Sequence, residues 1–424
     1  MTEYPAAHKN SFIWLKDNLA VVLVLLAFLL FTSKSLYNYP VGIMALLGLF
    51  RLLRNPKVVL SNHNIRKFVS LFLCLWVPML IALIDAVSLE HALHTVMPYI
   101  RFLFLGIYLI SEIKTLSAQK ALLLGLFCLV AFWCIDAVMQ VLFTIDLFGY
   151  PYEARHITGM FYPKNTIAHI CAGLSPLYFE LIRQTYKQNK SVLLLLIPLF
   201  VVILISGRRA TWVMLAISVS GYIYFLTRIQ SGFTVSTKHL LSIALVLTMI
   251  MGAIVVKHEP INRRVMVTMG LFSGDYEAMD KATAKRLPLW KTAVYMAREN
   301  WINGVGPRGF RHAYAEFTGD NDYWSKTGQT HPHQIILEIL TESGIIGLLG
   351  LFIFLFLFYR FVAASDTDPP LFPWAWAVFV VIFPINTHMA FYGSYWSSFF
   401  WLLLVLCFVT ANNKTSSTKS ITQS

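Results

Sequence analysis

Two adjacent arginines, Arg208 and Arg209, interrupt a long apolar sequence and are the first candidates for binding an anion. They stand between two apolar stretches, where the second is expected to begin a helix. The N-terminal end of a helix already carries a partial positive charge, so two guanidinium groups are unfavourable there unless an anion is bound. A phosphate group would offset this cost. The alternative is that both side chains extend toward lipid headgroups at a membrane surface.

Arg101 is a second candidate because it lies within the apolar stretch 97–110. An ionisable side chain in such a stretch is expensive to bury and by default indicates a functional site. Two interpretations are open. Arg101 contacts a charged substrate, or it is neutralised within the protein by a partner such as Asp136, which lies in another apolar stretch.

The sequence His331-Pro332-His333-Gln334 precedes a further apolar stretch and offers a candidate general base. Proline is favoured at the first position of a helix, so Pro332 predicts His331 as the cap and His333 in the first turn. The helix dipole is then expected to keep the His333 imidazole neutral near pH 7, as a general base requires. Glu338 and Glu342 lie off the face of His333, so its orienting partner must come from elsewhere.

The two histidines also have other interpretations. A histidine before a helix can serve only as a capping residue, and a His-x-His pair can bind a metal ion. The pair alone is a weak ligand signal, and no third ligand follows nearby. We therefore expect no metal and no cofactor.

Three more arginines, Arg286, Arg308 and Arg311, occur in the polar segment that directly precedes the two histidines. In the turn from Gly304 to Arg308, two glycines would let backbone amides approach an anion, although a short Gly-x-Gly is a weak signal. Several arginines and a histidine beside a membrane indicate a site for an anionic lipid headgroup.

Apolar helices must position these residues. The chain has 424 residues, of which 57% are hydrophobic and 13% charged, and its mean hydropathy is +0.63. A transmembrane helix needs about 20 mostly apolar residues. The sequence therefore predicts an all-α polytopic membrane protein with about 12 transmembrane helices. The expected spans are 18–33, 37–53, 67–86, 94–113, 118–143, 163–183, 191–207, 209–228, 239–257, 344–363, 371–387 and 391–411.

Basic residues predict how these helices are oriented. The segment 51–67 contains five basic residues and no acid, whereas the turn 85–94 contains no lysine or arginine. Because basic loops stay on the cytoplasmic side, both termini are expected there. Because basic residues in cytoplasmic loops account for part of the formal net charge of +13, this charge does not indicate binding to nucleic acid. The first apolar run is expected to be a retained helix, and the five cysteines, all in apolar stretches, are not expected to form disulfides.

The polar segment 257–330 is expected to face the external side, and loops of this length are usually functional. Within it, Leu287, Trp290, Val294 and Ala297 occur at helical spacing, which predicts an amphipathic helix at the membrane surface. The predicted organisation is a helical region 1–256, a loop 257–332 with amphipathic helices, a helical region 333–411 that begins with the histidine, and a tail 412–424.

Several motifs resemble the O-antigen ligase and polymerase superfamily of bacterial envelope glycosyltransferases. His333-Gln334 is followed, after nine residues, by Gly344-Ile345-Ile346-Gly347, which is similar to the ligase pattern of histidine, a small polar residue, nine residues and Gly-x-x-Gly. The motifs cover residues 155–350, and elsewhere only hydropathy and helix count match. The other similar features are Arg209 after an apolar helix, Arg286 with Trp290, the turn Gly304-x-Gly306, and the aromatic-Pro-x-Asn-x-x-Ala segment within Phe161–Ala168, which contains Asn165.

The resemblance implies a GT-C-like, metal-independent enzyme of the bacterial inner membrane with its large loop and active site in the periplasm. The donor would be a glycan linked to undecaprenyl diphosphate, and the acceptor a sugar hydroxyl of lipid A-core oligosaccharide. His333 would act as the general base, while Arg209 and Arg286 would bind the diphosphate and stabilise charge on the leaving group. In-line attack would invert the anomeric centre. Further substrate contacts are expected from Arg208, Arg308, Arg311, Arg101, His331 and Asn165, and the helices would contact membrane lipids.

Other functions remain open at this point. A polymerase of the same superfamily would use the same donor and extend a carrier-linked glycan, and a protein O-oligosaccharyltransferase would glycosylate a serine hydroxyl. A polytopic lipid-glycan flippase or transporter would also have about 12 helices, but transporters often show related halves and coupling acids near mid-membrane. The candidate residues here gather at one membrane face, which favours the ligase.

Overall fold

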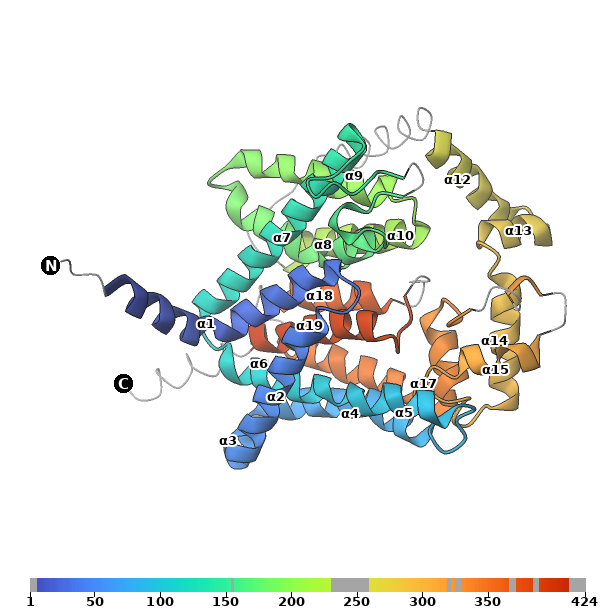
Figure 1. Cartoon of the computed structure of the whole chain (residues 1–424), viewed down its shortest axis with the longest axis horizontal. Helices are drawn as coiled ribbons and strands as arrows, with labels where there is room; N and C mark the ends of the chain where they lie inside the picture. The colour runs from blue at the N-terminus through green and yellow to red at the C-terminus, as the bar shows by residue number, and fades with distance from the viewer. Residues whose placement is uncertain are drawn as a thin grey trace.

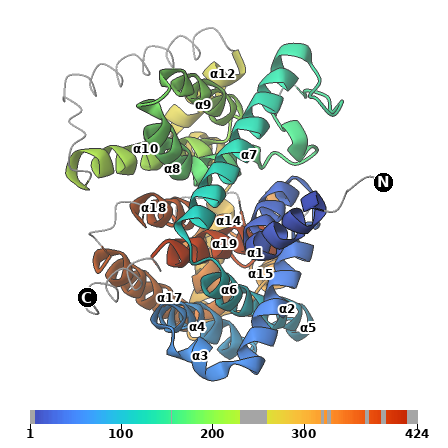
Figure 2. The ribbon, with the colours of Figure 1, turned by 90° about the vertical axis from the view of Figure 1, so that its left-hand side faces the viewer.

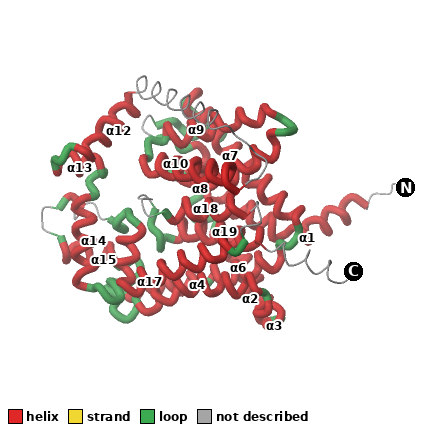
Figure 3. The backbone as a smooth tube through the Cα atoms, turned by 180° about the vertical axis from the view of Figure 1, so that it is seen from behind, coloured by secondary structure: helices red, strands yellow, loops and turns green. Residues whose placement is uncertain are grey.

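The computed structural model describes residues 6–153, 156–229, 259–318, 322–324, 329–365, 371–383 and 389–411, and these form helices with no β-strand (Figure 3). Backbone groups inside a bilayer must satisfy their hydrogen bonds within the protein, and an α-helix does so within one segment. The helices of the apolar regions are α1 (Ala6–Leu29), α2 (Asn38–Arg54), α3 (Pro56–Ser61), α4 (His63–Ile81), α5 (Leu89–Tyr99), α6 (Arg101–Glu112), α7 (Leu116–Phe143), α8 (Ile167–Tyr186), α9 (Leu196–Ile205), α10 (Arg209–Tyr224), α17 (Ile335–Ala363), α18 (Leu371–Ile382) and α19 (Ser394–Thr410).

Five helical stretches in the described residues are long and apolar enough to cross a membrane. They are His63–Ile81, Leu89–Glu112, Leu116–Phe143, Arg209–Arg228 and Ile335–Ala363, and several shorter apolar helices accompany them. The described residues are thus all-helical, and their long apolar helices indicate a multi-pass membrane protein. Helices overlap each predicted span within the described residues, whereas the predicted span 239–257 lies outside them. A total of about 12 spans stays a prediction.

Two groups of helices flank a central pair (Figure 2). One group contains α7, α8, α9 and α10, and the other contains α2, α4, α6 and α17, as their mutual contacts show. Helix α18 packs against α8 and α10, while α19 packs against α18 and α6. Helix α19 is apolar around its whole circumference and is buried along nearly its full length, as expected for a helix at the centre of a bundle.

The polar segment contributes four further helices, α12 (Glu259–Met269), α13 (Tyr276–Ala282), α14 (Leu287–Glu299) and α15 (Phe310–Phe317). They lie at the opposite end of the molecule from the start of α1 (Figure 1). Helices α14 and α15 share a small core that is separate from the main one, and α14 also packs against α17. This core contains Leu289, Ala293, Met296, Val305, Phe310, Ala313 and Tyr314.

The predicted amphipathic helix is confirmed as α14, but its predicted apolar face is only partly correct. Ala297 of that face is buried and Val294 is exposed, and the other buried apolar residues are Leu289, Ala293 and Met296. Helix α14 thus carries apolar residues on two faces. Helices α15 and α17 cover the face with Leu289, Ala293 and Met296. Packing against protein therefore determines the orientation of α14, where the sequence had indicated a membrane surface.

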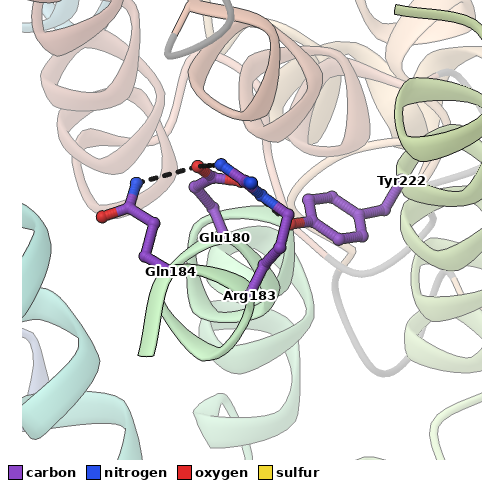
Figure 4. Close-up of polar contacts among 4 residues, drawn as sticks. All are labelled: Glu180, Arg183, Gln184 and Tyr222. Carbon is purple, nitrogen blue, oxygen red and sulfur yellow. Dashed lines mark hydrogen bonds and ion pairs between the residues drawn. The ribbon is translucent and has the colours of Figure 1, made fainter. Parts of the chain in front are cut away.

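A buried carboxylate connects α8 to α10 near the end of α8 (Figure 4). Glu180 is only 3% exposed and accepts hydrogen bonds from Arg183 at 2.6 and 2.9 Å. Glu180 also accepts from the Gln184 amide at 2.8 Å and from the Tyr222 hydroxyl at 2.9 Å. Four donors thus compensate one buried charge, as such a burial requires.

Replacing Glu180 with leucine is expected to destabilise the bundle by about 3 kcal/mol, because the largely buried Arg183 guanidinium would lose its counter-charge. Thermal unfolding of the detergent-solubilised protein measures this effect. Tyr222→Phe is the milder comparison and is expected to cost about 1 kcal/mol for one lost hydrogen bond. An unchanged melting temperature in Glu180→Leu would show that the ion pair contributes no net stability.

Candidate functional site

The turn between α9 and α10 places Arg208 and Arg209 at the start of a helix, as predicted. Arg208 is the N-terminal cap of α10 and Arg209 its first residue. Gly207 before them has φ +63°, a conformation that favours glycine. The indole nitrogen of Trp212 donates to the carbonyl oxygen of Ile203 at 3.2 Å, which ties the first turn of α10 back to α9.

Arg209 joins α10 to the helices of the polar segment. Its guanidinium donates to the carbonyl oxygen of Ala282, at the end of α13, and to the hydroxyl of Thr268 on α12 at 3.4 Å. A fourth arginine, Arg264 on α12, lies directly against this turn: a Cβ atom built on Gly207 would fall 0.9 Å from its Nη1. Glycine at position 207 therefore leaves room for the Arg264 guanidinium.

Asn165 contacts the same arginines from the loop before α8. In the amide orientation that satisfies its neighbours, its oxygen accepts from Arg208 Nε at 3.2 Å and from His156 Nδ1 at 3.0 Å. His169, in the first turn of α8, is fully buried and interacts electrostatically with Arg208 and Arg286. The motif segment 161–168 thus lies beside the turn that carries Arg208.

Four arginines form what we call the arginine cluster: Arg208, Arg209, Arg264 and Arg286. Burial lowers the pKa of Arg286 to about 10, and the charges of Arg209 and Arg208 contribute to this shift. Burial and the charge of Arg264 likewise lower the pKa of Arg208. Among the ion pairs of the described residues, none involves Arg208, Arg209 or Arg286. The cluster therefore concentrates positive charge in a partly buried place, which favours an anionic ligand.

Arg264 was not singled out from the sequence, although a signal existed. It belongs to the pair Arg263–Arg264 in the segment predicted to be external, where topology gives no reason for basic residues. The same argument that selected Arg208 and Arg209 would have selected this pair. Only the fold shows that Arg264, and not the exposed Arg263, turns toward the cluster.

His333 lies before α17 and not in its first turn, so the predicted helix start is wrong. The cap of α17 is Gln334, whose side chain accepts from the Leu337 amide at 2.5 Å, and the helix begins at Ile335. His333 itself has φ +57°, which no helical residue adopts. The glutamine provides the cap that the sequence had assigned to His331, and the helix therefore starts three residues later.

Two neighbours orient the histidine rings. His333 Nε2 lies 3.0 Å from the side-chain oxygen of Gln329, and His331 Nδ1 lies 2.8 Å from the Thr330 hydroxyl. The two imidazole rings are 4.0 Å apart. Because the amide oxygen of Gln329 can only accept, Nε2 of His333 carries the hydrogen and Nδ1 the lone pair. Gln329 is thus an orienting partner that the sequence did not identify.

Helix α14 brings His333 and Arg286 to the same region. Arg286 is the N-terminal cap of α14, and Trp290 lies one turn further on. The indole nitrogen of Trp290 donates to the carbonyl oxygen of Pro332 at 3.0 Å, immediately before His333. One turn of α14 therefore separates the arginine cluster from the residue that holds the histidine segment.

Arg308 and Arg311 lie elsewhere, near two buried carboxylates of α17. The Arg308 amide donates to Glu342 at 2.6 Å, and the Arg308 charge acts on both Glu338 and Glu342. Glu338 also accepts from the amides of Phe391 and Tyr392, at 3.0 and 3.1 Å. Arg308 thus balances buried acids, while Arg311 is exposed on α15.

The glycine turn packs against the backbone of α17. The Val305 amide donates to the Thr341 carbonyl at 2.9 Å, and the Ile345 amide donates to the Trp301 carbonyl at 2.8 Å. A Cβ on Gly304 would lie 2.5 Å from the α17 backbone at Glu342, and one on Gly344 would lie 2.2 Å from the Ile302 carbonyl. Gly304 and Gly344, the first glycines of the two motifs, therefore form one backbone contact that fixes the segment after α14 on α17.

Substitution of Gly344 by alanine is expected to disrupt this contact. Gly344 has φ +61° and ψ −160°, a region nearly restricted to glycine, and a methyl group would also collide with the Ile302 carbonyl. We expect a loss of about 2–4 kcal/mol, measured by thermal unfolding in detergent. Gly42→Ala on α2 is the matched control because nothing lies within 4 Å of its Cβ position. Equal stability of the two variants would contradict this account.

The suggested pairing of Arg101 with Asp136 is wrong. Asp136 accepts hydrogen bonds from the amides of Leu147 and Met160, each at 3.0 Å, and so holds the loop between α7 and α8. Arg101, at the start of α6, donates to the Ser394 hydroxyl at 2.8 Å. Its guanidinium carbon also lies 4.9 Å from the centre of the Phe102 ring. The aspartate's oxygens are occupied by backbone groups, so it does not neutralise the arginine.

Comparison with known proteins finds one family whose model matches part of the chain. Residues 193–352 match the family model described as O-antigen ligase. A search of curated proteins finds no match to the chain. The matched region includes the arginine cluster, α14, the histidine segment and the Gly-x-x-Gly break in α17, which are the parts that contact one another in the fold. Within residues 193–352, the chain is therefore similar to the O-antigen ligase family.

Proposed function

We propose that the protein transfers a glycan from undecaprenyl diphosphate to a sugar hydroxyl of lipid A-core oligosaccharide. The carrying observation is that one turn of α14 connects the arginine cluster to the histidine segment, through Arg286 at its start and Trp290 at Pro332. This reaction needs a site that binds the diphosphate of the donor and, close to it, a base for the acceptor hydroxyl. The match of residues 193–352 to the O-antigen ligase family model supports the same assignment.

In the proposed reaction the acceptor hydroxyl oxygen attacks the anomeric carbon of the donor sugar. The bond from that carbon to the diphosphate oxygen breaks, and undecaprenyl diphosphate leaves with the bonding electron pair. The His333 imidazole, oriented by Gln329, acts as the general base and takes the hydroxyl proton. Attack opposite the leaving group inverts the anomeric centre, which the stereochemistry of the product can test.

The arginine cluster would bind the diphosphate and stabilise the charge that develops on it. Arg286, Arg208 and Arg209 are partly buried, so their interaction with a phosphate is weakened less by solvent than at an open surface. Arg264 adds a further guanidinium from α12. Because these donors are already in place, little reorganisation is needed as the bond breaks. Arg308 is not part of this cluster, and its backbone amide donates to Glu342.

The left-handed backbone of His333 supports a functional role for its segment. A non-glycine residue in this conformation costs about 1–3 kcal/mol, and such residues cluster at functional sites. His333 at φ +57° and Lys285 at φ +60°, directly before Arg286, both show it. The loop would face the periplasm and both termini the cytoplasm, in a bacterial inner membrane, as the distribution of basic residues predicts.

Gln329 is expected to act as a positioning residue. Gln329→Ala should lower kcat about five- to tenfold, the value of one hydrogen bond, while the KM values for both substrates stay near those of the wild type. Gln329→Glu keeps an oxygen acceptor for His333 Nε2 and should restore most of the rate. Steady-state transfer assays measure both. A loss of rate that the glutamate variant does not recover would show that Gln329 has another role.

The assignment is tested by offering the purified enzyme two acceptors with one carrier-linked donor. A ligase transfers the glycan to lipid A-core oligosaccharide and leaves a second carrier-linked glycan unextended. Extension of the carrier-linked glycan alone would identify a polymerase instead.

A further inference from the structure

A groove of about 670 Å³ lies on the face of α14 that is turned away from its buried core. Tyr276 of α13, Trp290, Tyr295 and Arg298 of α14, and Phe317 of α15 line it. This volume is typical of sites for small ligands. The reaction proposed above uses none of these side chains directly.

Aromatic rings form the apolar part of the groove. The Tyr295 side chain is 52% exposed and Tyr276 is 59% exposed. Tyr295 packs against the Phe317 ring with 5.8 Å between centroids, so its ring is held in place from one side. Exposed, fixed aromatic rings offer flat apolar faces with polar edges. The C–H faces of a pyranose ring, surrounded by hydroxyl groups, are complementary to such a surface.

The groove carries a positive charge. Lys291 and Arg298 line it and are exposed, and neither takes part in an ion pair of the described residues. Its acidic residue, Asp322, already accepts hydrogen bonds from the Tyr314 hydroxyl at 2.7 Å and the Trp324 amide at 3.0 Å. Two cations beside a carboxylate that is engaged by protein donors favour an anionic ligand.

Trp290 connects the groove to the catalytic region. Its ring lines the groove, while its indole nitrogen donates to the Pro332 carbonyl, one residue before His333. A saccharide lying along the groove could therefore extend to the base. The acceptor is the substrate whose hydroxyl must reach His333, whereas the donor diphosphate would occupy the arginine cluster.

We propose that this groove binds the saccharide part of the acceptor through aromatic stacking and through negatively charged groups on that saccharide. The inference rests on the proposed function because it names the place of the second substrate. It adds acceptor-specificity residues, Tyr295, Lys291 and Arg298, to those that carry out the transfer.

The kinetic test uses variants on the exposed face of α14. Tyr295→Ala should raise the KM for the lipid A-core acceptor about tenfold and leave kcat and the donor KM near wild type, since a stacking contact is lost. Tyr295→Phe keeps the ring and should behave like the wild type. Arg298→Gln should raise the acceptor KM about threefold, as expected for one exposed charge. Lys281→Ala removes a cation of α13 outside the groove and is the charge-matched control.

A binding measurement separates this inference from the proposed function. Core oligosaccharide, with its phosphate groups intact or removed by hydrofluoric acid, is titrated against the enzyme without donor. The phosphorylated form should bind more tightly to the wild type, and Arg298→Gln should lose this preference. Equal binding of both forms, unchanged acceptor KM in Tyr295→Ala, or a change in the donor KM alone would overturn the inference. Tight, groove-dependent binding without any transfer would uphold the groove and overturn the proposed function.

Discussion

Replacing His333 with alanine should reduce glycan transfer about 10²- to 10⁴-fold, the usual contribution of a general base. The reason is that no group would take the proton from the acceptor hydroxyl as it attacks. His333 does not belong to the arginine cluster, so the carrier-linked donor should still bind. Donor binding and single-turnover transfer, measured on the same preparation, distinguish these effects.

His94→Ala is a suitable control for this variant. His94 is exposed near the middle of α5 and contacts none of the proposed site, so its loss should leave the rate unchanged. A His333→Ala enzyme that folds, binds donor and transfers glycan at the wild-type rate would remove the base from the mechanism. Loss of donor binding together with loss of transfer would instead place His333 in the donor site.

Replacing Arg286 with glutamine should lower kcat about 10²- to 10³-fold, because a preorganised donor to the leaving group would be lost. Arg286 is the arginine whose pKa is lowered to about 10 by burial and by neighbouring Arg209 and Arg208, so its charge is held at a cost that a bound diphosphate would repay. Arg286→Lys keeps the charge but loses the planar fork, and should retain an intermediate rate.

The control for Arg286 is Arg263→Gln, which removes an exposed arginine beside the cluster without altering the cluster itself. Its transfer rate should match that of the wild type. Comparable losses in both variants would mean that the net positive charge of this face, and not the diphosphate contact, supports activity. Transfer assays at two salt concentrations separate these cases, since long-range attraction is screened by salt and a buried contact is screened much less.

The fold class could be predicted from the sequence because apolar composition is a property of whole segments. Hydropathy identified the helical regions, and the amphipathic pattern identified α14. The orientation of α14 could not be predicted in the same way. Two apolar sets share that helix, and only the positions of Phe310 on α15 and of α17 determine which set is buried.

For the candidate site, the sequence identified the main arginines but not all of the residues that surround them. The sequence selected Arg208, Arg209 and Arg286 by charge and topology, and the fold brings these three together. Their neighbours Asn165 and Arg264 arrive from distant segments. Asn165 was selected only through the family resemblance, and Arg264 was not selected at all.

A local cap explains the incorrect prediction at α17, and loop contacts explain the one at α7. The sequence His331-Pro332 predicted a cap at His331. The cap is Gln334 instead, so His333 lies outside the helix. Asp136 is occupied by backbone amides of a loop whose course the sequence does not show, and is therefore not a partner for Arg101. The cap at Gln334 is a local contact that competes with the proline signal, whereas the contacts of Asp136 depend on the course of the following loop.

The most direct test of the account is transfer by the purified enzyme in liposomes. The liposomes contain an undecaprenyl-diphosphate-linked glycan and lipid A-core oligosaccharide, with no nucleotide or other protein. The wild-type enzyme should form a glycan-capped lipid A-core product with an inverted anomeric centre, and this product should be nearly absent with His333→Ala. A product formed equally by both enzymes, or a glycan extended only on its carrier, would contradict this expectation.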